Sequence, residues 1–175
     1  MLKKSLFSFI CLFCFIATAN AQTEKGYWFF NPQFSAFDLS GTENSLGKDD
    51  RLRLGFGVKT GNFITDNFAF IVGAGFQIDK QDKYKSNSFD LSTGVRYYLF
   101  SRLFLGAEVA YQKQWIRDYN NEKTRKPDYF LFNADIGYAI FLTHNISLEP
   151  GVYWKHSFAD KYNQYGIKLG FGLYF

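Results

Sequence analysis

The 175-residue sequence has few of the residues that build cross-linked or metal-bound proteins. Its two cysteines, Cys11 and Cys14, lie close to the start, so residues 22–175 contain none. This excludes a small exported domain that depends on disulfides. The two histidines, His144 and His156, are separated, and with no cysteine beside them we expect no transition-metal site and no cofactor.

Long hydrophobic runs are also scarce. The longest, Leu6–Ala17, is about a dozen residues and is shorter than the ~20 residues of a spanning helix. Lys3 and Lys4 precede it and Ala19-Asn20-Ala21 follows, which is typical of a cleaved signal peptide. We therefore predict a signal peptide over residues 1–21 and one domain over residues 22–175, with an uncleaved anchor helix as the alternative.

The sequence also lacks a large excess of positive or negative charge. The net charge is +4, and without Lys3 and Lys4 it is +2. So balanced a chain predicts no nucleic-acid partner.

Aromatic residues are abundant, with 22 Phe and 12 Tyr, and only three prolines occur. Apolar residues fall on every second position, which predicts β-strands with two different faces. Pro32 and a slip in the alternation near residues 37–39 indicate a bulge in the first strand. The eight predicted strands cover 27–39, 51–61, 68–79, 88–100, residues from 103, residues from 129, residues from 146, and 165–175.

The predicted connections alternate in length. Three are short turns, at 61–67, 100–102 and 142–145, and four are longer polar loops, at 40–50, 80–87, 117–127 and 158–163. An even number of strands with short turns at one end is typical of an outer-membrane barrel. The fold class we predict is all-β, an eight-stranded antiparallel up-and-down transmembrane β-barrel.

The two faces of the strands differ sharply. Alternation alone allows a soluble barrel with an apolar interior or a membrane barrel with an apolar exterior. One face collects glycines and charges of both signs, which suit a narrow interior, while aromatics such as Tyr27, Phe63 and Trp154 are expected to form two belts near the strand ends. The predicted lumen charge network is Arg51, Arg53, Lys59, Asp90, Arg96, Glu108, Asp135, Glu149, Lys155 and Lys168.

This network has two interpretations. Paired charges would form a salt-bridged core that fills the barrel. Alternatively, the same charges would line a narrow or gated ion path.

The last residues carry a further pattern. Alternate positions before the final Phe are apolar, and they resemble the C-terminal signal by which the barrel-assembly machinery recognises its clients. The residues of this predicted signal are Tyr165, Ile167, Leu169, Phe171, Leu173 and Phe175.

From residue 22 to 175 the chain resembles the small eight-stranded OmpA/OmpX-like outer-membrane barrels, often called the porin family. The stretch Thr60–Phe76 looks typical of them. The resemblance implies a monomer in a Gram-negative outer membrane, assembled with periplasmic chaperones and the barrel-assembly machinery. It implies a structural, adhesion or surface-interaction role, with a small porin or ion channel as the alternative and a lipid A-modifying enzyme as a further one.

Catalysis is not expected. The only Ser–His candidate is the adjacent pair His156 and Ser157, which a regular strand points to opposite faces. The long loop at 117–127 is the other candidate site, because its basic residues could contact lipopolysaccharide phosphates. The alternative is a solvated hairpin tip. The four basic residues of this possible contact are Arg117, Lys123, Arg125 and Lys126.

Overall fold

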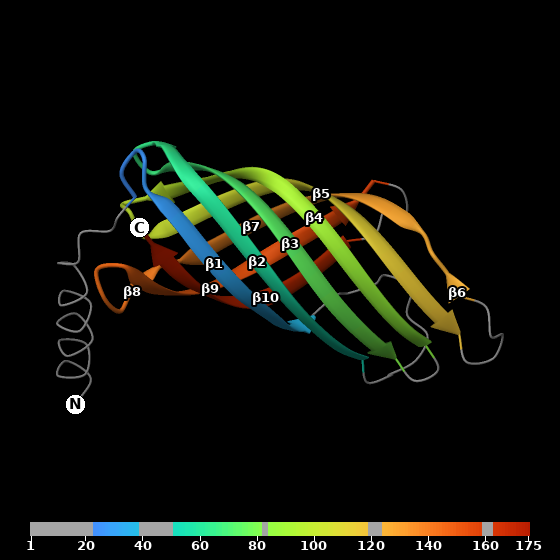
Figure 1. The fold of residues 1–175 in the computed structure, drawn as a ribbon. Helices are drawn as coiled ribbons and strands as arrows, with labels where there is room; N and C mark the ends of the chain where they lie inside the picture. Colours follow the sequence, from blue (N-terminus) through green and yellow to red (C-terminus); the bar gives the residue numbers. More distant parts are fainter. Residues whose placement is uncertain (1–22, 39–50, 82–83, 119–123, 159–162) are drawn as a thin grey trace, which may run out of the picture.

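The computed structural model describes residues 23–38, 51–81, 84–118, 124–158 and 163–175, which form a closed antiparallel β-barrel (Figure 1). None of these residues belongs to a helix long and apolar enough to cross a membrane. The strands are β1 (Trp28–Asp38), β2 (Arg51–Thr65), β3 (Phe68–Gln81), β4 (Tyr84–Leu99), β5 (Leu103–Asp118), β6 (Thr124–Arg125), β7 (Asp128–Tyr138), β8 (Ile140–Phe141), β9 (Ile146–Ser157) and β10 (Asn163–Tyr174).

Eight of the strands make the wall, in the order β1-β2-β3-β4-β5-β7-β9-β10. The two-residue strands extend the wall on either side of β7, since β6 pairs with β5 and β8 pairs with β9. The predicted eight-stranded up-and-down barrel is confirmed.

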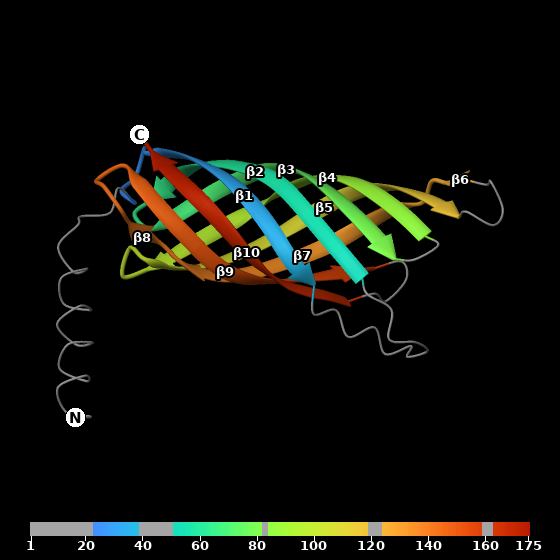
Figure 2. The same ribbon diagram turned by 90° about the horizontal axis from the view of Figure 1, so that it is seen from below.

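The barrel closes where β1 meets β10, as Figure 2 shows. Their register shifts between Ala36 and Asp38, so the predicted bulge is confirmed. The ladder from β1 to β10 passes from Phe30 to Gln33 without pairing Asn31 or Pro32. Proline has no N–H to donate, so the closing seam is where the wall tolerates it.

One of the three short turns is shorter than the sequence predicted. The predicted turn at 61–67 is wrong in extent, because β2 continues to Thr65 and only Asp66 and Asn67 connect it to β3. Asn67 adopts a φ of 63°, the left-handed conformation that asparagine accepts in tight turns. The turns at 100–102 and 142–145 lie where predicted.

Strands also extend further at the long-loop end. β3 reaches Gln81 and β4 begins at Tyr84, so most of the predicted 80–87 loop is strand. Likewise Arg117 and Asp118 belong to β5. Ladder hydrogen bonds continue here between polar residues, which the apolar alternation could not reveal. The predicted loop at 40–50 and most of that at 158–163 lie outside the described residues.

The apolar face of the wall points outward. Phe34, Leu91 and Val109 are each more than half exposed, whereas Arg96 and Glu149 are almost fully buried. This arrangement is the inverse of a soluble barrel with an apolar interior. The alternative interpretation of the sequence, a soluble barrel, is therefore wrong about which face of the strands points inward.

Candidate functional site

The interior of the barrel is closed at the short-turn end by aromatic rings. Phe29, Phe63, Tyr98, Phe104 and Tyr174 are buried there and touch one another, and we call them the aromatic cluster. Neighbouring ring centroids lie 5.7 Å apart for Phe29–Phe63, 5.5 Å for Phe63–Tyr98 and 5.7 Å for Tyr98–Phe104. These separations are typical of stabilising aromatic pairs, so the packed rings fill the lumen at this end.

The aromatic cluster corrects one sequence prediction. The sequence also did not predict that these five rings would pack together. Phe63 was expected in an outer belt, but its side chain is inside the barrel, and Tyr27 packs against the cluster. In the alternation, Tyr98 shares the face of Arg96, and Tyr174 shares that of Lys168. The alternation did not predict that residues from five strands would pack together at the same level along the barrel axis.

Arg96 of β4 lies directly on the aromatic cluster. Its guanidinium carbon is 4.3 Å from the ring centroid of Phe104 and 5.3 Å from that of Phe29. Its Nη1 is 3.1 Å from Oε2 of Glu149, and its Nη2 is 3.8 Å from Oδ2 of Asp135. The planar cation therefore joins the rings below it to two carboxylates.

Glu149 of β9 accepts hydrogen bonds from several side chains of the interior. The Tyr174 hydroxyl donates to its Oε1 at 2.6 Å and the Ser147 hydroxyl donates to the same oxygen at 2.9 Å. Asn31 Nδ2 donates to Oε2 at 3.1 Å. With Arg96, these donors satisfy both oxygens of a carboxylate that has almost no exposed surface.

Two further ion pairs stand beside this centre. Lys59 of β2 pairs with Glu108 of β5, and Lys168 of β10 pairs with Asp135 of β7. The Ser92 hydroxyl donates to the second oxygen of Glu108 at 2.8 Å. Neither pair joins neighbouring strands, because β3 and β4 lie between β2 and β5 and β9 lies between β7 and β10, so both pairs link the wall through the lumen.

Small residues make room for these pairs. A Cβ on Gly106 would collide with the carboxylate of Asp135, and one on Gly172 would collide with Ser147 and Glu149. At these two positions glycine is required by the close approach of an inward side chain.

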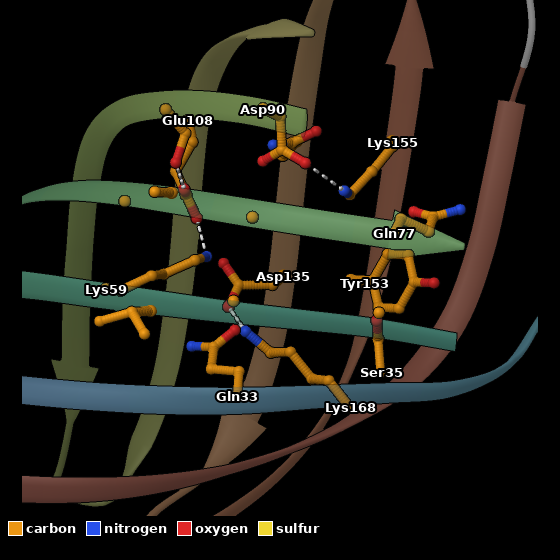
Figure 3. A pocket seen from close by; sticks show the side chains of 18 of the residues that line it. Gln33, Ser35, Lys59, Gln77, Asp90, Glu108, Asp135, Tyr153, Lys155 and Lys168 are labelled. Carbon is orange, nitrogen blue, oxygen red and sulfur yellow. Dashed lines mark hydrogen bonds and ion pairs between the residues drawn. The ribbon is translucent and has the colours of Figure 1, made fainter. Parts of the chain in front are cut away.

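The Lys59–Glu108 and Lys168–Asp135 pairs line a lumen cavity of about 90 Å³, together with Asp90 and Lys155 nearer the long-loop end (Figure 3). Lys155 and Asp90 face each other across it at 3.8 Å and are more exposed than the pairs below. Two oxygens that line the cavity region, Asn133 Oδ1 and Asp135 Oδ1, are buried and make no hydrogen bond in the described structure. The cavity is large enough for a few water molecules to bind them.

The structure places eight of the ten predicted lumen charges inside the barrel. Only the Arg51 and Arg53 side chains lie outside the described part. The eight balance as four cations and four anions: Lys59, Arg96, Lys155, Lys168, Asp90, Glu108, Asp135 and Glu149.

The predicted C-terminal signal forms the outer face of β10. Its six side chains, Tyr165, Ile167, Leu169, Phe171, Leu173 and Phe175, are 39–66% exposed. Of the four basic residues predicted to contact lipopolysaccharide, Arg117 belongs to β5 and Arg125 to β6. Lys126 is exposed, and Lys123 lies outside the described residues.

The candidate Ser–His pair is not formed. His156 pairs with Phe132 and Ser157 with Leu131 in an unbroken ladder, so the two side chains point to opposite sides of the wall. Ser157 is buried in the lumen, and His156 is on the outer surface. His144 is exposed in the turn at 142–145, at the other end of the barrel.

No family model and no curated protein matches this chain. Solved structures match it in fold. The attachment invasion locus protein Ail of Yersinia pestis matches with a TM-score of 0.63 and 11% identity over 86% of this chain and 99% of Ail.

Two other barrels match similarly. Neisserial surface protein A has a TM-score of 0.57 and 16% identity over 85% of this chain and 97% of its own. The outer membrane protein OprG from Pseudomonas aeruginosa has a TM-score of 0.57 and 10% identity over 89% and 99%. At such identities the likeness shows the fold, that of small outer-membrane barrels.

Proposed function

We propose that this protein is an integral barrel of a Gram-negative outer membrane, with a structural or surface-interaction role and a lumen that does not conduct. One observation carries the proposal: the wall exposes apolar side chains while the interior holds paired charges and packed rings. Such a continuous apolar exterior is unstable in water but matches hydrocarbon. A closed barrel also satisfies its backbone hydrogen bonds there.

The orientation follows from the turns. β1 begins and β10 ends at the short-turn end, where Trp28 and Phe175 exchange backbone hydrogen bonds of 2.7 and 2.9 Å. Short turns face the periplasm in such barrels, so the polar extensions of β3, β4 and β5 face outside. Export through a signal peptide over residues 1–21 and recognition of the outer face of β10 by the barrel-assembly machinery complete this proposal.

A surface role fits better than a channel. The aromatic cluster and the Arg96–Glu149 pair occupy the lumen at the short-turn end, and the eight predicted lumen charges whose side chains the structure describes are four cations and four anions. A pore needs a continuous polar path and groups that release ions readily. Ail, a fold neighbour, is an attachment protein by name, which supports a contact role for the outer end.

Planar-bilayer conductance of the refolded barrel tests the proposal. Folding is first verified by a shift in gel mobility between unheated and boiled samples. We expect no discrete current steps from the verified barrel, since the aromatic cluster leaves no path. Reproducible steps would replace this function with that of a small ion channel.

The basic residues of 117–127 are proposed to contact lipopolysaccharide. Neutralising Arg117, Lys123, Arg125 and Lys126 together should weaken binding of the barrel to lipopolysaccharide vesicles, most strongly at low salt. Unchanged binding would identify this segment as a solvated hairpin.

A further inference from the structure

The outer wall contains a groove of about 580 Å³ across β5, β7, β9 and β10. Ala134 forms its floor, and it pairs with Ala107 of β5 on one side and with Trp154 of β9 on the other. Ala134 is a small residue in a wall of large ones and leaves this hollow. Trp154 and Tyr165 bound it at one side.

Aliphatic side chains continue the groove towards the short-turn end. Ile136, Val152 and Ile167 form one row there, as the ladders pair Ile136 with Val152 and Val152 with Ile167. Successive rows on one face lie about 7 Å apart along the strands. The groove is thus an apolar slot that spans four strands and two rows of outward side chains, and it is open to the membrane side.

Two hydrogen-bonding side chains, His156 and Asn163, lie one row beyond the slot towards the long-loop end. His156 Nδ1 lies 2.8 Å from Asn163 Oδ1, and Trp154 Nε1 donates to the same oxygen at 3.2 Å. Because that oxygen only accepts, the proton of the neutral ring is on Nδ1. Nε2 of this tautomer is then an acceptor, which can accept a hydrogen bond from a hydroxyl of a ligand.

Aromatic rings hold His156 in place. The His156 ring centroid is 5.8 Å from that of Trp154 and 5.7 Å from that of Phe158. Two rows higher along the same face is Lys113, whose Nζ is 4.0 Å from Asp128, both about half exposed. From slot to rim the face therefore changes from aliphatic, through aromatic and hydrogen-bonding, to charged.

This order matches one kind of molecule. An acyl chain fits the slot, a sugar hydroxyl fits His156, and a phosphate near the rim would compete with Asp128 for Lys113. We propose that this face is a specific site for the lipid A part of lipopolysaccharide, a phosphorylated and acylated glucosamine disaccharide. The proposal rests on the proposed outer-membrane location, which brings the long-loop end to the leaflet that contains this lipid.

Native mass spectrometry of the purified barrel tests the site, with lipid A and phosphatidylglycerol as the two probes. Ala134→Leu fills the slot, and His156→Phe keeps the ring but removes both nitrogens. Each should weaken lipid A binding by up to about tenfold, the effect of one hydrogen bond or of lost apolar contact.

Matched controls exist elsewhere on the barrel. Ala74→Leu makes the same change on the outer face of β3, and His144→Ala changes the histidine of a short turn. Both should bind lipid A as the unaltered barrel does. Equal lipid A binding by Ala134→Leu and Ala74→Leu would contradict the proposal that lipid A occupies the groove. Equal binding of lipid A and phosphatidylglycerol would show that the site accepts any anionic lipid.

Failure of this site is distinguishable from failure of the proposed function. The substituted positions lie on the outer wall, so each variant should still show the heat-dependent gel shift and insert into vesicles. A barrel that inserts but does not prefer lipid A contradicts only the site. One that does not insert contradicts the membrane location itself.

Discussion

The two halves of the lumen are built on different principles. At the short-turn end, rings from five strands pack with Arg96, and every oxygen of Glu149 has a donor. At the long-loop end, Lys155 and Asp90 face each other across a cavity and keep some contact with water. The first half stabilises the barrel through desolvated pairs that depend on one another, and the second tolerates change. Substitutions in the two halves should therefore differ in effect.

The largest effect is expected from Arg96→Met. It removes the only cation within ion-pair distance of Glu149 among the described residues, and an uncompensated buried charge costs about 3–5 kcal/mol. Urea unfolding of the barrel in lipid vesicles, followed by tryptophan fluorescence, measures this loss.

The double variant Arg96→Met/Glu149→Gln is the control for Arg96. It removes both charges and should recover part of the lost stability. An unchanged midpoint for the single variant would mean that the aromatic cluster alone closes this half.

A smaller effect is expected from Tyr174→Phe, which keeps the ring and removes the hydroxyl that donates to Glu149 at 2.6 Å. A hydrogen bond to a charged group contributes about 1.5–3 kcal/mol. Tyr97→Phe, a change on the outer wall, serves as the matched control and should leave the unfolding midpoint unaltered. Equal midpoints for the two variants would show that the ring, not the hydroxyl, matters.

The smallest effect is expected from Lys155→Met in the polar cavity. Its pair with Asp90 is long and partly hydrated, so its loss should cost no more than about 1 kcal/mol. The same unfolding measurement applies. A loss as large as that of Arg96→Met would remove the distinction between the two halves.

The period-two pattern was enough to predict the strands, the closure and the direction in which Arg96, Glu108 or Lys168 points. It could not predict partners, because the tilt of the strands brings residues distant in sequence to one height. Lys59 meeting Glu108, or Phe63 meeting Tyr98, depends on that stagger. The polar ends of β3 and β4 were missed because they are held by ladder hydrogen bonds and have no apolar face to signal them.

The seam between β1 and β10 has a consequence for how the barrel forms. It joins the two strands that are farthest apart in the chain, so every other ladder can form locally before this one. A wall with such a join has a high contact order, and its last step must overcome the largest loop-closure entropy. Because Asn31 and Pro32 interrupt the same seam, β1 and β10 pair in two short stretches. Closure of this join is therefore the step expected to limit the folding rate.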